Sequence, residues 1–197
     1  MRTNKILNYE SILQVLDDPG CPFCRFMKNF QASVLQDTTE KNIHHLCNFH
    51  TWGLAATQQA ASAADVFLHL LERQADPSSP SSCDVCILLQ LEEALRIREF
   101  LACLQHKLVA QWLKSHAAFC TIHGTKLKQG TDTVLASTIT SIMERYRLSL
   151  VEELTRMRKE HQPSGAKWGV LGNVAEFLVS QRGLHVEPKG GDYADDR

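Results

Sequence analysis

The sequence predicts an all-α fold, built as two tandem helical hairpins that are each pinned by a metal ion and followed by a C-terminal helix. Apolar residues recur every three or four positions, no segment shows a convincing alternating strand pattern, and a pair of cysteine motifs occurs twice. We expect a single helical domain over residues 1–185. Its pseudo-repeats are 5–75 and 83–161, joined by the Pro/Ser-rich linker 76–82.

The first pseudo-repeat predicts three helices. An N-terminal apolar stripe stops at the Asp-Asp-Pro-Gly segment 17–20, and a second helix begins just after Cys24. The alanine-rich segment 49–75 predicts one longer helix, whose small residues allow close packing against its neighbours. The N-terminal stripe consists of Ile6, Tyr9, Leu13 and Leu16, and the stripe of the second helix consists of Met27, Phe30 and Val34.

The second pseudo-repeat predicts two long apolar stripes. The stripe over 87–112 contains no Gly or Pro, and the stripe over 135–157 predicts a long helix with Thr131 or Asp132 as its N-cap. The first of these stripes consists of Ile87, Leu91, Ala94, Ile97, Leu101, Leu104, Leu108 and Trp112. A C-terminal helix over 166–182 and a flexible tail over 186–197 complete the expected organisation.

Two four-residue motifs alternate along the chain in the order CxxC, CxxH, CxxC, CxxH. They use six of the seven cysteines and two of the nine histidines. Each copy therefore supplies the four ligands of a closed tetrahedral zinc site. The expected metal ligands are Cys21, Cys24, Cys47 and His50 in the first copy, and Cys83, Cys86, Cys120 and His123 in the second.

Pairing within each copy constrains the path of the chain. An unbroken helix from Cys86 to Cys120 would be roughly 50 Å long, so its two ends could not share one ion. If the ligands pair within a copy, the chain must turn between them, and we expect the turn near Ala102–His106.

The motif chemistry favours two structural zinc ions per chain. A CxxC or CxxH at a helix start places its ligands beside free backbone N–H groups, which favour thiolates. An iron–sulfur cluster held by three cysteines and one histidine is the alternative, and no residue decides between them. Dithiol exchange at Cys-Pro-Phe-Cys is a further reading, but the βαβ pattern that usually accompanies it is missing.

The segments CPFC, LCNFH, CDVC and FCTIH together resemble an uncharacterised family of bacterial all-helical proteins with paired CPxC and GxCxxH metal-binding motifs. The resemblance covers residues 15–180 and implies that the eight motif residues are metal ligands, but it implies no activity. Leu46 and Phe119 stand where that family carries glycine before each CxxH.

Composition excludes several classes of protein. The formal net charge of -1 provides no basic excess for a phosphate backbone, so nucleic acid is not an expected partner. No apolar run is long enough for a membrane span, and the N-terminus lacks the pattern of a signal peptide. We therefore expect a cytoplasmic protein, in which paired cysteines serve as metal ligands more often than as disulfides.

The remaining residues give no catalytic site. Cys103 is expected to pack in the second hairpin, His44 and His45 to lie in a loop, and Lys126 to lie on a solvated helix face. A site with four protein ligands leaves no position for water, which argues against a metal-dependent enzyme. We expect a metal-binding protein that presents a helical surface to a partner protein, with a redox or iron–sulfur sensor as the alternative. The oligomeric state stays open.

Overall fold

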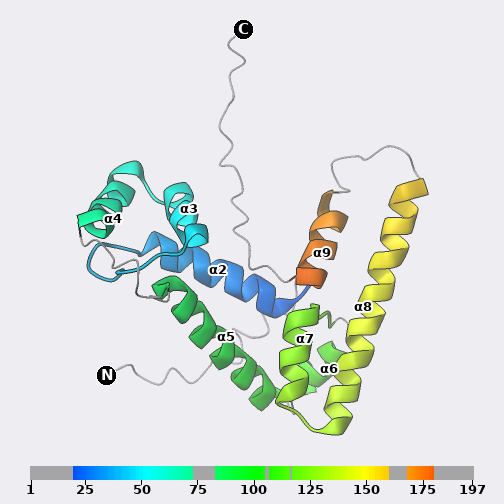
Figure 1. Ribbon diagram of the computed structural model, residues 1–197. Helices are drawn as coiled ribbons and strands as arrows, with labels where there is room; N and C mark the ends of the chain where they lie inside the picture. Colours follow the sequence, from blue (N-terminus) through cyan, green and yellow to red (C-terminus); the bar gives the residue numbers. More distant parts are fainter. Residues whose placement is uncertain (1–19, 73–82, 105–106, 116, 160–167, 180–197) are drawn as a thin grey trace. The chain divides into compact units, whose positions relative to one another are not determined.

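The computed structural model describes residues 20–72, 83–104, 107–115, 117–159 and 168–179, and over these ranges the chain is all helical (Figure 1). The all-α fold class is therefore confirmed. The helices that the model describes are α2 (Pro22–Gln36), α3 (Asn48–Thr57), α4 (Ala60–Glu72), α5 (Asp84–Cys103), α6 (Lys107–Ser115), α7 (Thr121–Gln129), α8 (Thr133–Lys159) and α9 (Trp168–Val179).

The chain divides into two compact units, and the first of them combines two stretches that are separate in the sequence. Unit 1 contains the described residues of Met1–Met27 and Leu91–Arg182, and unit 2 contains those of Lys28–Gln90. Both boundaries fall inside helices, so α2 and α5 each contribute one end to each unit. The single domain over 1–185 and the internal repeat are not tested by this division and stay predictions.

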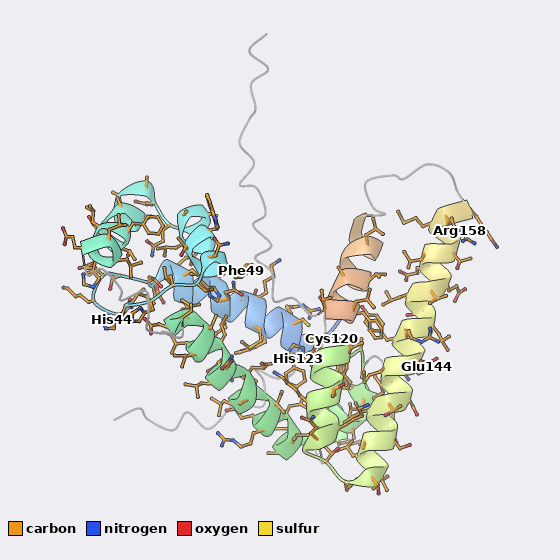
Figure 2. The ribbon with its side chains drawn as sticks, in the orientation of Figure 1. His44, Phe49, Cys120, His123, Glu144 and Arg158 are labelled. Atoms are coloured by element: carbon orange, nitrogen blue, oxygen red, sulfur yellow. The ribbon has the colours of Figure 1, made fainter. Side chains whose placement is uncertain are left out.

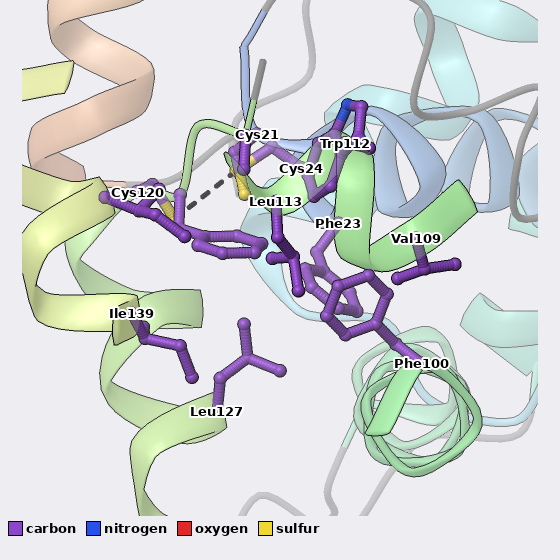
Figure 3. Packing of buried hydrophobic residues seen from close by; sticks show 13 residues of the cluster. Cys21, Phe23, Cys24, Phe100, Val109, Trp112, Leu113, Cys120, Leu127 and Ile139 are labelled. Atoms are coloured by element: carbon purple, nitrogen blue, oxygen red, sulfur yellow. Dashed lines mark hydrogen bonds between the residues drawn. The ribbon is translucent and has the colours of Figure 1, made fainter. Parts of the chain in front are cut away.

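The core of unit 1 is built around a group of aromatic rings. Phe100 meets the Phe23 ring edge-on at a centroid separation of 5.3 Å, and it also meets Trp112 at 6.3 Å. Phe119 packs edge-on against Trp112 at 5.8 Å. Such edge-to-face pairs add about 0.5–1.5 kcal/mol each beyond their buried area. Figure 3 shows how this group continues into Val109, Leu113 and the cysteines of α2 and α7.

The long helix α8 packs against α7 and α9 in unit 1. Asp132 caps its N-terminus, because the carboxylate accepts a hydrogen bond of 2.8 Å from the backbone N–H of Leu135. Ile139, Ile142 and Leu150 are buried, which confirms these members of the stripe predicted from the sequence. The C-terminal helix predicted over 166–182 is also observed, as α9.

Unit 2 differs from the expectation at the alanine-rich segment. The single helix predicted over 49–75 is wrong, because the chain breaks at Gln58 between α3 and α4. The Gln58 side-chain amide donates hydrogen bonds to the carbonyls of Leu35 at 2.8 Å and Thr38 at 2.6 Å. The Gln58 side chain therefore provides partners for carbonyls at and just beyond the C-terminal end of α2, where the helix itself offers none. Leu35, Ile43, Leu54 and Val66 form the buried core around this junction.

The stripe predicted on α5 is buried only in its later part, where Ile97 and Leu101 pack against the core of unit 1. Leu91, expected on the buried stripe, is 64% exposed and Ile87 is 41% exposed. The buried residues are Val85, Glu93 and Phe100. The chain does leave the helix where a turn was expected, since α5 ends at Cys103 and α6 begins at Lys107.

Several expectations fall outside the residues that the structure describes. These are the helix that carries Ile6, Tyr9, Leu13 and Leu16, the linker 76–82 and the tail 186–197. Among the helices that are described, none combines the length and the apolar character needed to cross a lipid bilayer.

The contact between α7 and α8 leads to a test of the packing in unit 1. A Cβ added at Gly124 would overlap the side chain of Met143, whereas nothing lies within 4 Å of a Cβ added at Gly172. We expect Gly124→Ala to destabilise the protein by about 1–3 kcal/mol through overpacking. Gly172→Ala should instead stabilise α9 by about 0.5–1 kcal/mol through helix propensity. Denaturant unfolding measures both changes.

The double variant Gly124→Ala with Met143→Ala should recover part of the lost stability, because it removes the overlapping side chain. Equal stability of Gly124→Ala and the wild type would contradict this packing.

Candidate metal centres

The structure brings the eight predicted ligands together in two clusters. Cluster 1 consists of Cys21, Cys24, Cys120 and His123, and cluster 2 consists of Cys47, His50, Cys83 and Cys86. Within each cluster the ligand atoms all lie within 4.8 Å of one another. Pairing within each motif copy is therefore wrong. The first CxxC meets the last CxxH, and the inner CxxH meets the second CxxC.

The lengths of α2 and α5 explain this crossed pairing. The 15 residues of α2 carry the chain about 22 Å from Cys21, and the 20 residues of α5 carry it about 30 Å from Cys83. Helix α3 then stays at the far end of α2, where Gln58 binds the Leu35 carbonyl. The chain therefore runs the length of a helix between each CxxC and the CxxH that follows it in the sequence.

All four motifs open a helix in the same way. The first cysteine of each motif directly precedes the helix, and its carbonyl accepts the first i+4 hydrogen bond, at 2.9–3.3 Å. Cys47 and Cys120 are N-caps with nearly equal extended backbone angles, φ -75° and ψ 162° against φ -70° and ψ 165°. Figure 2 shows Cys120 and His123 at the start of α7. In each cluster two helix N-termini therefore face the same group of thiols, where their dipoles favour negative charge.

Cluster 1 is compact and fully buried. The Nδ1 atom of His123 lies 3.1 Å from the sulfur of Cys120, 3.4 Å from that of Cys24 and 3.6 Å from that of Cys21. The sulfurs of Cys24 and Cys120 are 3.6 Å apart, along the dashed line in Figure 3. Each of the four residues is at most 2% exposed.

A carboxylate lies behind the histidine of cluster 1. The Nε2 atom of His123 lies 3.0 Å from Glu93, whose other oxygen contacts the Lys126 ammonium at 2.6 Å. Burial by itself raises the pKa of Glu93, but His123 and Lys126 outweigh it and hold that pKa at about 2. Burial likewise lowers the pKa of His123, yet its contacts with Cys120, Cys24 and Glu93 raise it to about 11. Glu93 therefore fixes the ring with Nδ1 toward the thiols.

Helix α9 also closes on cluster 1. The carboxylate of Glu176 accepts a hydrogen bond of 2.6 Å from the backbone N–H of Cys21. The Thr121 hydroxyl donates to the carbonyls of Phe177 at 3.0 Å and Leu178 at 2.9 Å. Gly20 precedes Cys21 at a positive φ of 98°, and a Cβ there would come within 2.9 Å of the Glu176 carboxylate. This turn needs glycine for both its conformation and its space.

Cluster 2 has a similar shape with less burial. The Nδ1 atom of His50 lies 3.3 Å from the sulfurs of Cys47 and Cys83 and 3.4 Å from that of Cys86. The sulfurs of Cys47 and Cys86 are 3.9 Å apart. His50 and Cys83 are buried, whereas Cys47 and Cys86 are partly exposed.

The loop before Cys47 is fixed by the aspartate inside the second CxxC. Asp84 accepts hydrogen bonds from the backbone N–H groups of His44 at 2.7 Å and His45 at 2.9 Å, and its own N–H donates to the His45 carbonyl. Asp84 thus joins the two motifs of cluster 2. His44 and His45 lie in a loop, as the sequence predicted, and Figure 2 labels His44 there.

The thiols in the two clusters have unequal acidities. Burial raises the pKa of Cys21, and its sulfur neighbours raise it further. Hydrogen bonds from Cys21 and Cys24 lower the pKa of Cys120. Burial and the neighbouring Cys83 raise the pKa of Cys86 to about 12. Burial also opposes the ionisation of Cys47, but the backbone N–H of His50 and the thiols of Cys83 and Cys86 outweigh it and lower that pKa. In each cluster the thiol whose pKa is lowered is the one that caps a CxxH helix.

Both clusters have the donor set and the dimensions of a mononuclear tetrahedral site. Zinc–sulfur bonds of about 2.3 Å and zinc–nitrogen bonds of about 2.0–2.1 Å place two sulfurs about 3.8 Å apart and a sulfur and a nitrogen about 3.6 Å apart. The observed separations are 3.6 and 3.9 Å between sulfurs and 3.1–3.6 Å between sulfur and nitrogen. Both clusters could hold a metal ion.

Cys103 and Lys126, the other residues considered in the sequence, lie outside the two clusters. Cys103 packs against the core of unit 1, as expected, and none of the seven cysteines, all in described segments, forms a disulfide. Lys126, expected on a solvated face, instead contacts Glu93. Glu93, Asp84 and Glu176, which contact the clusters or their loops, were not predicted from the sequence. Glu93 had a detectable signal, because it lies seven residues after Cys86 and seven before Phe100, on one helical face.

Comparisons with models of protein families, with curated protein sequences and with solved structures give no match. The resemblance to a bacterial all-helical family therefore stays a prediction, and the two clusters carry the functional argument.

The crossed pairing can be tested with Cys24→Ser. After loading with zinc, this variant should bind one ion in place of two, and Cys21 and Cys120 should become reactive to N-ethylmaleimide together. The thiols of cluster 2 should stay protected. Peptide mass spectrometry locates the label. Cys103→Ser, the matched control, should still bind two ions. If Cys47 became reactive together with Cys21 in the Cys24→Ser protein, the crossed pairing would be wrong, and the ligands would pair within a motif copy.

The carboxylate behind His123 leads to a second test. Glu93→Gln keeps the shape of the side chain but removes its charge, so the zinc affinity of cluster 1 should fall by about 10–100-fold. Competition with a chelator of known affinity measures the change. The control is Glu92→Gln on the same helix, where Glu92 pairs with Arg96 instead. An affinity that is the same in Glu93→Gln and the control would show that Glu93 does not support the site.

Proposed function

We propose that this chain is a two-zinc protein in which each cluster binds one structural Zn²⁺. The observation that carries the proposal is the close agreement between the ligand separations in both clusters and the edges of a single zinc tetrahedron. Three thiolates and a neutral imidazole leave a bound zinc with a local charge near minus one, which the paired helix N-termini would stabilise.

Zinc is favoured over an iron–sulfur cluster by the compactness of the ligand groups. In a cluster of several irons the protein ligands are attached to different metal atoms and so stand further apart than four ligands of one ion. In this chain all four donor atoms of each group lie within 4.8 Å of one another. The close spacing supports one small ion per site.

Each zinc would join segments that are far apart in the sequence. Cluster 1 links the start of α2 to the start of α7, and cluster 2 links the start of α3 to the start of α5. Structural zinc contributes about 10–16 kcal/mol of apparent binding energy in small finger peptides, which is as large as the stability of a whole domain. We therefore propose that zinc stabilises the fold of each unit.

The role that follows is a binding one and not a catalytic one. Four side chains complete the coordination of each ion, so no position remains for substrate or water. Unit 2 exposes large apolar side chains on α3 and α4, with Trp52 at 71%, Leu71 at 74% and Leu68 at 56%. Exposed apolar groups of this kind are typical of a protein interaction surface. We propose a protein partner for this surface and a reducing, cytoplasmic location for the thiols.

The alternative is a redox protein that uses the same cysteines. It is favoured by the partial exposure of Cys47 and Cys86, whose sulfurs are 3.9 Å apart. The two functions give different predictions, because an iron–sulfur protein absorbs visible light and loses that absorbance on oxidation, whereas a zinc protein is colourless.

Elemental analysis tests the proposal directly. Protein purified without added chelator and without oxygen should contain two zinc ions per chain and show no visible absorbance. X-ray absorption at the zinc edge should show three sulfur ligands and one nitrogen ligand at each ion. Iron in place of zinc would favour the alternative. Less than one metal ion per chain under these conditions would reject metal binding by these clusters.

A further inference from the structure

The two clusters share their donor set but differ in their access to solvent. All four residues of cluster 1 are buried, whereas Cys47 and Cys86 of cluster 2 are partly exposed. A bound ion is exchanged most readily where a competing ligand can approach it before its own ligands have left. Cluster 2 offers such an approach on the side of these two cysteines.

The support behind the histidine also differs. His123 of cluster 1 has its Nε2 atom 3.0 Å from Glu93, which Lys126 holds in turn. The corresponding Nε2 atom of His50 is buried and has no hydrogen-bond partner among the residues that the structure describes. Outer partners of this kind orient a ligating histidine and increase its basicity. The imidazole of cluster 2 is therefore the more weakly supported ligand.

A hollow lies against one ligand of cluster 2. It has a volume of about 630 Å³, and its lining includes Cys47, Trp52, Ala55 and Leu71. The volume lies within the range of about 300–1,000 Å³ that is usual for small-molecule sites. Cys47 is the cluster ligand on its wall, so a small ligand in the hollow lies next to that thiolate.

We propose that cluster 2 is an exchangeable zinc site, from which a competing small thiol or chelator removes the ion through the hollow beside Cys47, whereas cluster 1 retains its ion. The inference rests on the proposed function. In the exchange the zinc–sulfur bond to Cys47 would break first as a bond forms from zinc to the incoming donor, an incoming thiol losing its proton to solvent, and the bonds to His50, Cys83 and Cys86 would then be replaced in the same way. The released Cys47 thiolate takes up a proton from solvent, and no electron is transferred.

Exchange at cluster 2 would couple unit 2 to the zinc supply. Cluster 2 joins the start of α3 to the start of α5, and Asp84 joins the loop before Cys47 to the same helix. Loss of the ion removes the bonds that hold these two helix starts together. The exposed apolar side chains of Trp52 and Leu71 lie on the same hollow, so their arrangement would change with the metal content of cluster 2.

The wild-type protein, loaded with two equivalents of zinc, is mixed with excess of a zinc-chelating pyridylazo dye and sampled with N-ethylmaleimide. Zinc should leave in two phases of equal amplitude whose rates differ by about tenfold or more. Mass spectrometry should find Cys47, Cys83 and Cys86 labelled during the fast phase, and Cys21, Cys24 and Cys120 only during the slow phase. Cys103, which belongs to neither cluster, provides a reference for labelling that does not depend on zinc.

A matched pair of variants tests the route. Ala55 lines the hollow, and its neighbour Ala56 on the same helix is exposed but does not. Ala55→Phe should slow the fast phase several-fold, and Ala56→Phe should leave both phases unchanged. Circular dichroism of both variants checks that α3 is retained.

The outcomes separate the two proposals. If the protein takes up two zinc ions but releases them at one rate, or releases the ion of cluster 1 first, the exchangeable site is wrong and the two-zinc protein stands. If equal effects appear in Ala55→Phe and Ala56→Phe, the hollow is not the route. If the protein takes up no zinc, the proposed function itself fails.

Discussion

A rigid helix carries the chain away from the cysteines at its own start, and this constraint decides which motifs can meet. Helix α2 carries the chain away from Cys21 before the CxxH motif at Cys47 begins, and α5 carries it away from Cys83 before the CxxH motif at Cys120. Each CxxC meets the CxxH of the other motif copy. The aromatic packing of Phe23 on Phe100 in unit 1 and the capping of α2 by Gln58 in unit 2 are consistent with this arrangement.

The four motifs have the same local geometry, but the two clusters that they form have different surroundings. The carbonyl of every first cysteine accepts the first hydrogen bond of its helix, so the backbone places the four motifs in the same way. The differences come from the next layer of residues. Glu93 and Lys126 support cluster 1 from behind, and Glu176 covers it, whereas the Cys47 corner of cluster 2 opens on a hollow.

The all-α class, the break after Cys103 and the membership of all eight cluster residues were predictable from the sequence, because periodicity and motif spacing are local signals. The pairing was not, since it depends on where α2 and α5 end in space. The break near Cys103 was inferred from a pairing that is wrong, and it is present for another reason: α6 places Val109 and Trp112 in the core beside Phe100. The start of the α5 stripe, at Ile87 and Leu91, was misjudged because apolar residues occupy both faces of that part of the helix, and only tertiary packing selects the buried one.

The nested order of the two clusters has a consequence for biosynthesis. All four residues of cluster 2 lie between positions 47 and 86, inside the sequence that cluster 1 spans from position 21 to position 123. During synthesis all four residues of cluster 2 are therefore present in the nascent chain before Cys120 and His123 of cluster 1 have been added. At about 5–20 residues per second, this interval lasts several seconds. During this interval the only CxxH motif already synthesised is the one at the start of α3, which belongs to the inner cluster.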